Sequence, residues 1–223
     1  MERDKRTFKQ ATANMNRAQK LSYIWLYYKF HIITTIIVIL LAVGGVSSLL
    51  NRKDTVLNVR LVASGMNVDS LTKLQEKAES ELITDKKKQD MAFVFVSDQG
   101  ADTKSVVGNQ QLYVPLAAGD IDIIMIPKEG FEALASQGFF IDLSSITELS
   151  AKSGKELTLL NFKAQVEGES EVEKPYGIDI SNFPVLEQLS VSHKDMVLGI
   201  VASAKNRDIC VNFINWLSKQ NGL

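Results

Sequence analysis

Hydrophobic residues are distributed along this chain in one long uninterrupted run and several short ones. The long run, Phe30–Leu50, contains no Asp, Glu, Lys or Arg, and its single ionisable residue, His31, lies at its start. About 20 apolar residues, at roughly 1.5 Å per residue, cross a bilayer core of about 30 Å as a helix. The pattern therefore predicts a transmembrane helix over Phe30–Leu50.

Basic residues flank this run unequally. Seven Lys and Arg residues precede it against two acidic residues, whereas only Arg52 and Lys53 follow it closely. Lys and Arg near a span are retained on the cytoplasmic side of the membrane. We therefore expect a single-pass protein of the cell membrane with a cytoplasmic N-terminus and an extracytoplasmic C-terminal domain. The chain after the basic tail carries 18 basic and 24 acidic residues, so the overall charge of −1 conceals a basic tail joined to an acidic domain.

Aromatic residues gather just before the apolar run. Trp and Tyr favour the headgroup region, where an apolar ring and a polar tip are both accommodated. Leu21, Ile24, Trp25 and Tyr28 also recur at helical spacing, which indicates a short interfacial helix or the cytoplasmic end of a tilted span. The residues that we expect at the membrane interface are Trp25, Tyr27, Tyr28, Lys29 and His31.

A cleavable signal peptide is the alternative interpretation of this run. Its centre, Ile32–Val43, has signal-peptide length, and the small residues of Gly44–Ser48 suit cleavage. The basic region before it is about thirty residues long, however, and the apolar character continues through Leu49 and Leu50, which favours a retained anchor. No cysteine lies near this segment, so a lipid-modified N-terminal cysteine is excluded.

Short runs of apolar and β-branched residues predict strands after the span. Met91–Val96 is almost continuously apolar, which is typical of a strand covered on both faces, as in a parallel sheet. Ile121–Ile126 and Met196–Ala202 predict further buried strands. The other strand candidates are Thr55–Ala63, which alternates, and Leu157–Val166 and Tyr176–Ile180, which flank a polar loop.

Helical periodicity occurs between these strands. Asp69 or Ser70 should cap a helix that ends at about Leu82. Alternating strands and helices predict the α/β class, with one three-layer domain around a mostly parallel sheet. The other expected helices are Gln110–Ala118, Lys128–Gln137 and Asn206–Lys219.

The chain is thereby divided into four segments. Residues 1–29 form a basic cytoplasmic tail with an interfacial aromatic segment, 30–50 the transmembrane helix, 51–54 a linker and 55–223 the extracytoplasmic domain. A segment of about 170 residues is long enough for its own hydrophobic core. The single cysteine, Cys210, leaves no internal disulfide to staple it.

Catalytic and metal-binding signatures are scarce. The sequence lacks His-Glu-x-x-His, Cys-x-x-Cys, Gly-x-Ser-x-Gly and a phosphate-binding Gly-rich loop. His193 lies in a polar stretch and Cys210 on an apolar helix face, which favours a surface role and a core role over catalysis. Asp120 precedes the predicted strand Ile121–Ile126 and Asp122 lies near its start, whereas open parallel sheets bind ligands at the carboxyl ends of strands, which favours a structural role for this carboxylate pair. We therefore expect neither an enzyme nor a metal or other cofactor.

A small-molecule site, if the domain has one, is expected in the loops that follow the first three strands. Ser, Asp and backbone groups there could bind a polar ligand, and the alternative interpretation is that they are turn and helix-cap residues. The candidate ligand-binding residues are Ser64, Gly65, Ser97, Asp98, Pro127 and Lys128.

Three segments of the domain carry recognisable motifs. Leu116–Ile126 contains Ala-Gly-Asp-Ile-Asp leading into a strand, Tyr176–Ser181 reads Tyr-Gly-Ile-Asp-Ile-Ser, and Leu198–Leu217 joins a late strand to a helix with Phe, Trp and Leu on one face. Together they resemble the extracellular solute-binding proteins of bacterial ABC importers. Before the span, a Trp-x-Tyr-Tyr-Lys-x-His pattern is similar to that of membrane-anchored, solute-binding-like proteins of low-GC Gram-positive bacteria; its residues are Trp25, Tyr27, Tyr28, Lys29 and His31.

This resemblance implies one lobe of a solute-binding fold, because the two-lobed members of that family are far longer than the segment after Thr55. It implies an accessory or interaction module of a membrane complex, such as a transporter. The alternative is an ABC-importer receptor for a small polar solute such as a sugar or peptide. The expected partners are the lipid bilayer and a membrane protein, with a small-molecule ligand left open; the acidic domain makes nucleic acid a poor partner.

Overall fold

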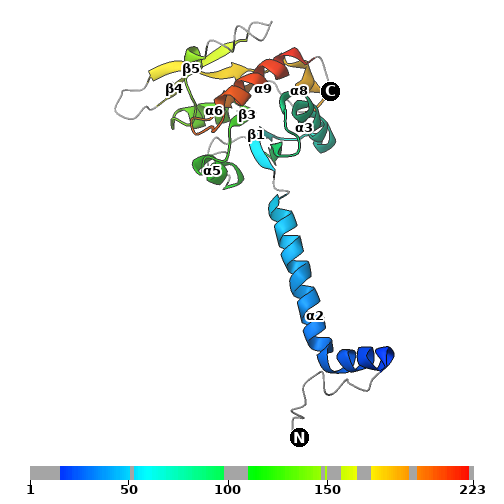
Figure 1. The fold of residues 1–223 in the computed structure, drawn as a ribbon. Coiled ribbons are helices and arrows are strands. Elements are labelled where there is room, and N and C mark those ends of the chain that lie inside the picture. The colour runs from blue at the N-terminus through cyan, green and yellow to red at the C-terminus, as the bar shows by residue number, and fades with distance from the viewer. Residues whose placement is uncertain are drawn as a thin grey trace. The chain divides into compact units, whose positions relative to one another are not determined.

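The computed structural model divides the chain into two compact units, Met1–Arg52 and Lys53–Leu223. The first contains the long helix α2, Arg17–Leu50, and the second contains helices packed on one sheet (Figure 1). The residues that the structure describes are 16–50, 53–97, 110–146, 149, 157–164, 172–190 and 195–220.

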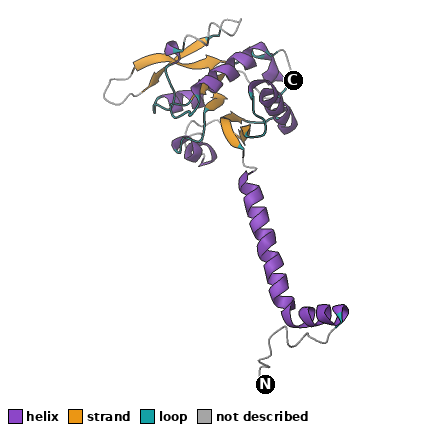
Figure 2. Cartoon of the chain, in the orientation of Figure 1, coloured by secondary structure: helices purple, strands orange, loops and turns teal. Residues whose placement is uncertain are grey.

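The described strands of the second unit form one sheet of six strands (Figure 2). Their order is β2-β1-β3-β6-β5-β4, so β2 and β4 lie at the two edges and β3 and β6 at the centre. The strands are β1 (Asp54–Ala63), β2 (Gln89–Ser97), β3 (Ile123–Pro127), β4 (Leu159–Ala164), β5 (Val172–Asp179) and β6 (Met196–Ile200).

The α/β class is confirmed, but the prediction of a mostly parallel sheet is wrong. β1 pairs in parallel with β2 and β3, whereas β6 runs antiparallel to β3 and β5, and β5 runs antiparallel to β4. All the residues of β6 are buried. A strand buried on both faces shows the same continuous apolar pattern in either direction, so its sequence did not reveal its orientation.

Helices cover both faces of the sheet and give three layers. β1 supplies both cores, since successive side chains of a strand point to opposite faces. Leu57, Val59 and Leu61 pack with α3, α8 and α9, whereas Val62 packs with α5 and α6. The helices are α3 (Val68–Leu82), α5 (Gln110–Ala117), α6 (Lys128–Ala135), α8 (Pro184–Glu187) and α9 (Arg207–Lys219), with a 3-10 turn at Leu143–Ser145.

Asn67, rather than Asp69 or Ser70, caps α3. Its side-chain oxygen accepts hydrogen bonds from the backbone N–H groups of Asp69 and Ser70 at 3.0 and 3.3 Å. The expected cap was placed too late because the first helical residue, Val68, is 61% exposed and does not continue the buried stripe. At α9 the predicted boundary is confirmed, since Asn206 precedes the helix and its side chain accepts a hydrogen bond from within the first turn.

β2 is an edge strand, and the expectation that Met91–Val96 is covered on both faces holds in part, since Met91 and Phe93 are buried in one core and Val96 in the other. Val94 is 40% exposed. Two side chains of α3 bond to the β2 backbone instead. Gln75 Nε2 donates to the carbonyl of Met91 at 2.7 Å, and the N–H of Met91 donates to Glu79 Oε1 at 3.1 Å. The helix thus satisfies backbone groups that a neighbouring strand would otherwise bond.

Two glycines allow an aromatic cluster to lie directly on the sheet. Phe131 of α6 stacks on Phe140 with ring centroids 4.1 Å apart, and its centroid lies 4.7 Å from that of Phe162. A Cβ at Gly199 would lie 2.5 Å from the Phe131 ring, and one at Gly177 would lie 2.9 Å from Phe162. Close packing therefore explains why two of the recognisable motifs contain glycine in a strand.

Helix α2 bends sharply between two arms, Arg17–Leu26 and Tyr28–Val43, which meet at 76° (Figure 1). No single helix in the described part of the chain has both the length and the apolar character needed to cross a membrane, and this bent pair meets the test only when the arms are taken together. The transmembrane helix over Phe30–Leu50 therefore stays a prediction. Its backbone is helical throughout.

Candidate functional site

The loops predicted to bind a ligand meet at the end of the sheet where β1, β2 and β3 finish. We call this end of the strands the carboxyl edge, as distinct from the edge strands β2 and β4. β1, β2 and β3 are parallel, and the pairs Ala63–Ser97 and Leu61–Met125 set the ends of these strands side by side. Asp98 lies outside the described residues. The candidates that the structure places at this edge are Ser64, Gly65, Ser97, Pro127 and Lys128.

The side chains at the carboxyl edge are largely open to solvent. Both serines and Lys128 are exposed, and nothing lies within 4 Å of the position that a Cβ of Gly65 would take. Pro127 is the N-cap residue of α6 and makes no side-chain capping bond. The backbone N–H of Lys128 donates to the carbonyl of Asp195 at 2.8 Å. Ligand binding here stays a prediction, and exposure of this kind also suits ordinary turn residues.

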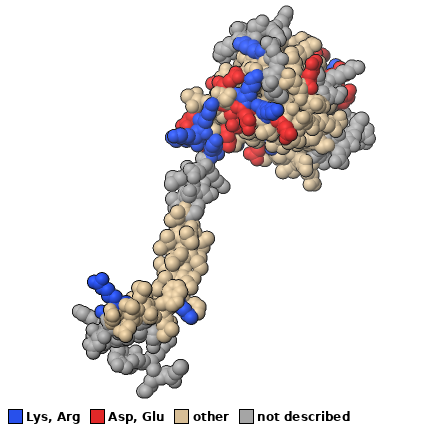
Figure 3. Space-filling view, turned by 90° about the vertical axis from the view of Figure 1, so that its right-hand side faces the viewer, with Lys and Arg blue, Asp and Glu red and all other residues tan. Residues whose placement is uncertain are grey.

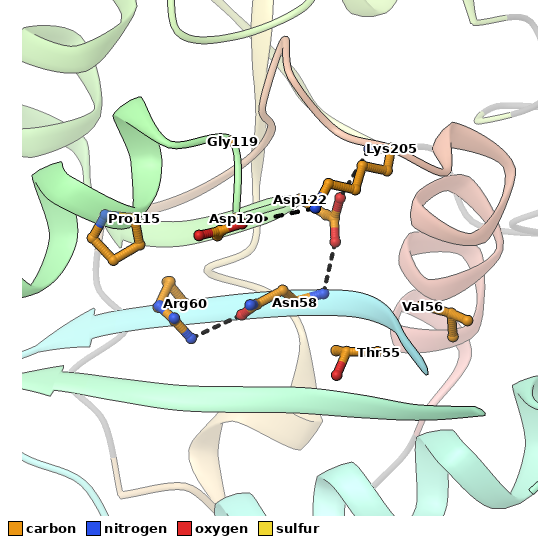
Figure 4. A pocket seen from close by; sticks show the side chains of 9 residues that line it. All are labelled: Thr55, Val56, Asn58, Arg60, Pro115, Gly119, Asp120, Asp122 and Lys205. Carbon is orange, nitrogen blue, oxygen red and sulfur yellow. Dashed lines mark hydrogen bonds and ion pairs between the residues drawn. The ribbon is translucent and has the colours of Figure 1, made fainter. Parts of the chain in front are cut away.

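A pocket of about 380 Å³ lies at the opposite end of these strands, where β1 and β3 begin, which we call the amino edge (Figure 4). One wall is formed by the first half of β1, with Thr55, Val56, Asn58 and Arg60. Asn58 and Arg60 are two residues apart on a strand and so share one face. Cavities of about 300–1,000 Å³ with a few convergent polar groups are typical of small-molecule sites.

The facing wall comes from two loops that the sheet topology brings together. Pro115 lies in α5, whereas Gly119, Asp120 and Asp122 belong to the passage from α5 into β3 and Lys205 to the loop after β6. Gly119 turns the chain with a φ of +72°, a conformation that glycine adopts without strain. Because β6 is antiparallel to β3, its carboxyl end reaches the edge at which β3 begins.

Asp122 ties three segments together at the amino edge. Its carboxylate accepts hydrogen bonds from the backbone N–H of Asn58 at 2.8 Å and from that of Lys205 at 3.1 Å. Its own N–H donates to the carbonyl of Asn58 at 2.9 Å. Asp122 is only 7% exposed. Each carboxylate oxygen accepts one backbone hydrogen bond, so this nearly buried residue has a structural role.

Arg60 places a partly buried positive charge in the pocket. Its Nη1 donates to Asn58 Oδ1 at 2.8 Å, whereas its Nε is buried and has no partner among the described residues. Burial lowers the pKa of the guanidinium, and the negative charge of Asp120 partly offsets this. Arginine stays protonated in proteins. The pocket is therefore lined by a positively charged side chain whose hydrogen-bond donors are only partly used.

Lys205 and Asp120 form the exposed rim of the pocket. Lys205 Nζ lies 3.7 Å from Asp120 Oδ1, and the two side chains are 76% and 60% exposed. Exposed ion pairs of this kind contribute little to stability. Both side chains can therefore reorient toward another partner at small cost.

Cys210 is unsuited to nucleophilic chemistry. It is fully buried in α9, and its Sγ donates to the carbonyl of Asn206 at 3.3 Å. Burial, together with the charge of Asp122, raises the pKa of the thiol to about 12. His193 lies outside the described residues. Among the residues that are described, no group of three or more His, Cys, Asp or Glu side chains could hold a metal ion.

The pocket at the amino edge was not predicted from the sequence. The signal that could have found it is the pair Asn58 and Arg60 inside Thr55–Ala63, two polar residues on one face of an otherwise apolar strand. Polar side chains on an inner strand call for partners on the same sheet face. Without the register of β1 against β3, these partners could not be named.

The residues predicted at the membrane interface lie around the bend of α2. Tyr28 and His31 contact each other edge to face with ring centroids 6.2 Å apart, and Lys29 Nζ lies 5.3 Å from the centroid of the Phe30 ring. Trp25 is 59% exposed on the first arm. The side chain of Tyr27 lies outside the described part of the structure.

Comparison with known proteins gave no match to any protein-family model, curated protein or solved structure. The likeness to solute-binding proteins therefore rests on the sequence motifs alone.

Proposed function

We propose that this chain is a single-pass membrane protein whose extracytoplasmic α/β domain is an accessory or interaction module of a membrane complex, such as a transporter. The carrying observation is the exposure of apolar side chains along the second arm of α2. Phe30, Leu40 and Leu41 are 72%, 65% and 70% exposed. Soluble proteins rarely leave such a surface uncovered, whereas a bilayer accommodates a helix that is apolar on all sides.

The dimensions and flanks of the helix support the same proposal. A helix over Phe30–Leu50 rises about 31 Å, close to the roughly 30 Å of a bilayer core. Lysines lie near the bend of α2, and the described side chains from Phe30 to Val43 include no Lys or Arg (Figure 3). Trp25 and Tyr28 are partly exposed beside this boundary, where headgroups would receive them.

A tethered single domain favours an interaction module over a diffusing receptor. A receptor released from the membrane can carry its ligand to a transporter. A domain joined to a membrane helix by a linker of a few residues stays beside its membrane neighbours. The resemblance to one lobe of a solute-binding protein points in the same direction, because one lobe lacks a second wall to enclose a solute.

Cysteine labelling on intact cells tests the topology. The native Cys210 is buried and its pKa is about 12, so an introduced cysteine is the only readily reactive thiol. We expect a membrane-impermeant maleimide to label Lys128→Cys on intact cells, and to label Arg17→Cys only after permeabilisation. Labelling of both variants on intact cells, or recovery of the full-length chain in the alkali-soluble fraction, would contradict the anchor.

Isolation of the intact protein from its native membrane tests the role as a module. In mild detergent we expect a complex that contains a second integral membrane protein in a fixed ratio. A monomer in several mild detergents would contradict the accessory role and leave the anchor standing.

A further inference from the structure

The pocket at the amino edge presents two positive groups and one available carboxylate. Arg60 and Lys205 carry the positive charges. Of the two acids, Asp122 is only 7% exposed and bonds to backbone N–H groups, whereas the Asp120 side chain is 60% exposed and is the acid more open to a ligand. Fixed charges of both signs in one cavity restrict the ligands that fit it, because each charge needs a partner when water is displaced.

Arg60 and Asp120 lie in one cavity without touching. No ion pair joins them among the described residues, although the charge of Asp120 raises the pKa of Arg60 against the effect of burial. Figure 4 shows Arg60 on β1 facing the turn that carries Asp120. Opposite charges separated by accessible space are best matched by a molecule that brings one charge to each.

We propose that this pocket binds a compact zwitterion, a molecule in which an ammonium group lies a few bonds from a phosphate or carboxylate. The guanidinium N–H groups of Arg60 donate to the anionic oxygens, and Lys205 approaches the same group from the rim. The ligand ammonium donates to the carboxylate of Asp120. The weak pair between Lys205 and Asp120 opens at small cost as both partners turn to the ligand.

Two sources could supply this chemistry. One is a free molecule such as phosphoethanolamine or an amino acid, and the other is the ethanolamine headgroup of a membrane lipid. The lipid source rests on the proposed membrane anchor, since β1 begins at Asp54, only a few residues after α2 ends at Leu50. The free source does not depend on the anchor, so failure of one leaves the other testable.

Titration of the purified full chain, in a detergent without amines or phosphate, tests the proposal. The probes are phosphoethanolamine, inorganic phosphate and ethanolamine, with binding followed by calorimetry. We expect phosphoethanolamine to bind at least about tenfold more tightly than either half alone, which corresponds to about 1.4 kcal/mol. Equal affinity for phosphate and phosphoethanolamine, or no binding up to about 10 mM of any probe, would overturn the proposal.

Variants at the two charges give a crossed result that a general loss of folding could not imitate. Arg60→Met should weaken binding of phosphoethanolamine and of phosphate alike, by at least about tenfold. Asp120→Asn should weaken phosphoethanolamine but leave phosphate unchanged or tighter, because it removes a repelling carboxylate. Lys73→Ala, at an exposed position of α3 that does not line the pocket, is the matched control and should change neither affinity.

The same variants decide among the remaining outcomes. Each is first checked for an unchanged melting transition, and Arg60→Lys replaces Arg60→Met if the latter melts early. Wild-type affinity in both Arg60→Met and Asp120→Asn would remove the pocket as the site. Vesicles with and without an ethanolamine lipid then separate the sources: competition by the lipid against free phosphoethanolamine identifies a headgroup, and its absence identifies a soluble ligand.

Discussion

The amino edge and the carboxyl edge differ in whether their polar side chains are buried and bonded or exposed. At the amino edge, a buried carboxylate, Asp122, bonds to the backbone of two other segments. At the carboxyl edge, Ser64, Ser97 and Lys128 are exposed, and Lys128 donates a hydrogen bond through its backbone N–H to the carbonyl of Asp195. The comparison teaches that a buried polar residue is more informative about architecture than several exposed ones, because burial must be compensated by bonds.

The largest expected effect is at Asp122. Asp122→Ala leaves two backbone N–H groups without an acceptor, and we expect a loss of about 2–4 kcal/mol in the free energy of unfolding. Urea denaturation measures this loss. Asp120→Ala is the matched control, two residues away in the sequence, and should change the free energy of unfolding by less than about 0.5 kcal/mol. Equal losses in the two variants would remove the distinction between the buried and the exposed carboxylate.

The second effect concerns Cys210, which lies close enough to Asp122 for that carboxylate to raise the pKa of its thiol. In the wild type we expect labelling of Cys210 to follow opening of the domain and to be slow at pH 8. Asp122→Ala should speed labelling by about tenfold or more, since about 1.4 kcal/mol of lost stability gives that factor. A thiol reagent with optical readout measures the labelling rate. An unchanged rate in Asp122→Ala would show that the hydrogen bonds of Asp122 do not control opening of the domain near α9.

The helix-capping hydrogen bonds reverse this contrast, because the cap near the carboxyl edge makes more and shorter hydrogen bonds than the cap near the amino edge. Asn67, in the loop after β1, accepts two hydrogen bonds, whereas Asn206, near the amino edge, accepts one that is recorded at 3.4 Å. We expect Asn67→Ala to cost about 1 kcal/mol and Asn206→Ala about half of that. Thermal melts in parallel compare them, and the reverse order would mean that the amino edge is the more stabilised throughout.

The smallest effects are expected at the exposed carboxyl edge. Ser64→Ala and Lys128→Ala should each shift the free energy of unfolding by less than about 0.5 kcal/mol, because neither side chain is buried. A loss above about 1 kcal/mol in urea denaturation would show that this edge is held by side chains as the amino edge is.

Much of the fold could be predicted from the periodicity of the sequence. Ile121–Ile126 and Met196–Ala202 were expected as buried strands, and Asn206–Lys219 as a helix, because these segments lie at the centre or pack closely on it. The direction of β6 and the edge position of β2 could not be predicted in this way. Both depend on which strands become neighbours, which local patterning does not specify.

The pocket lies at the end of the strands opposite to the predicted site, and its position could not be predicted for the same reason. The rule that open parallel sheets bind ligands beyond the carboxyl ends of strands points to Ser64 and Lys128. The antiparallel β6 brings its own carboxyl end, and Lys205 with it, to the edge where β1 begins. In a mixed sheet the rule no longer selects one end of the strands. Here the loop after β6 helps to form a pocket at the amino edge.

The side chains of α3 that bond to β2 also decide how this domain can associate with itself. A free strand edge templates further strands and so invites aggregation. Gln75 and Glu79 occupy backbone groups of Met91 that an incoming strand would need. Sheet extension is therefore blocked along that part of β2, so that a strand from another molecule cannot pair with the backbone of Met91.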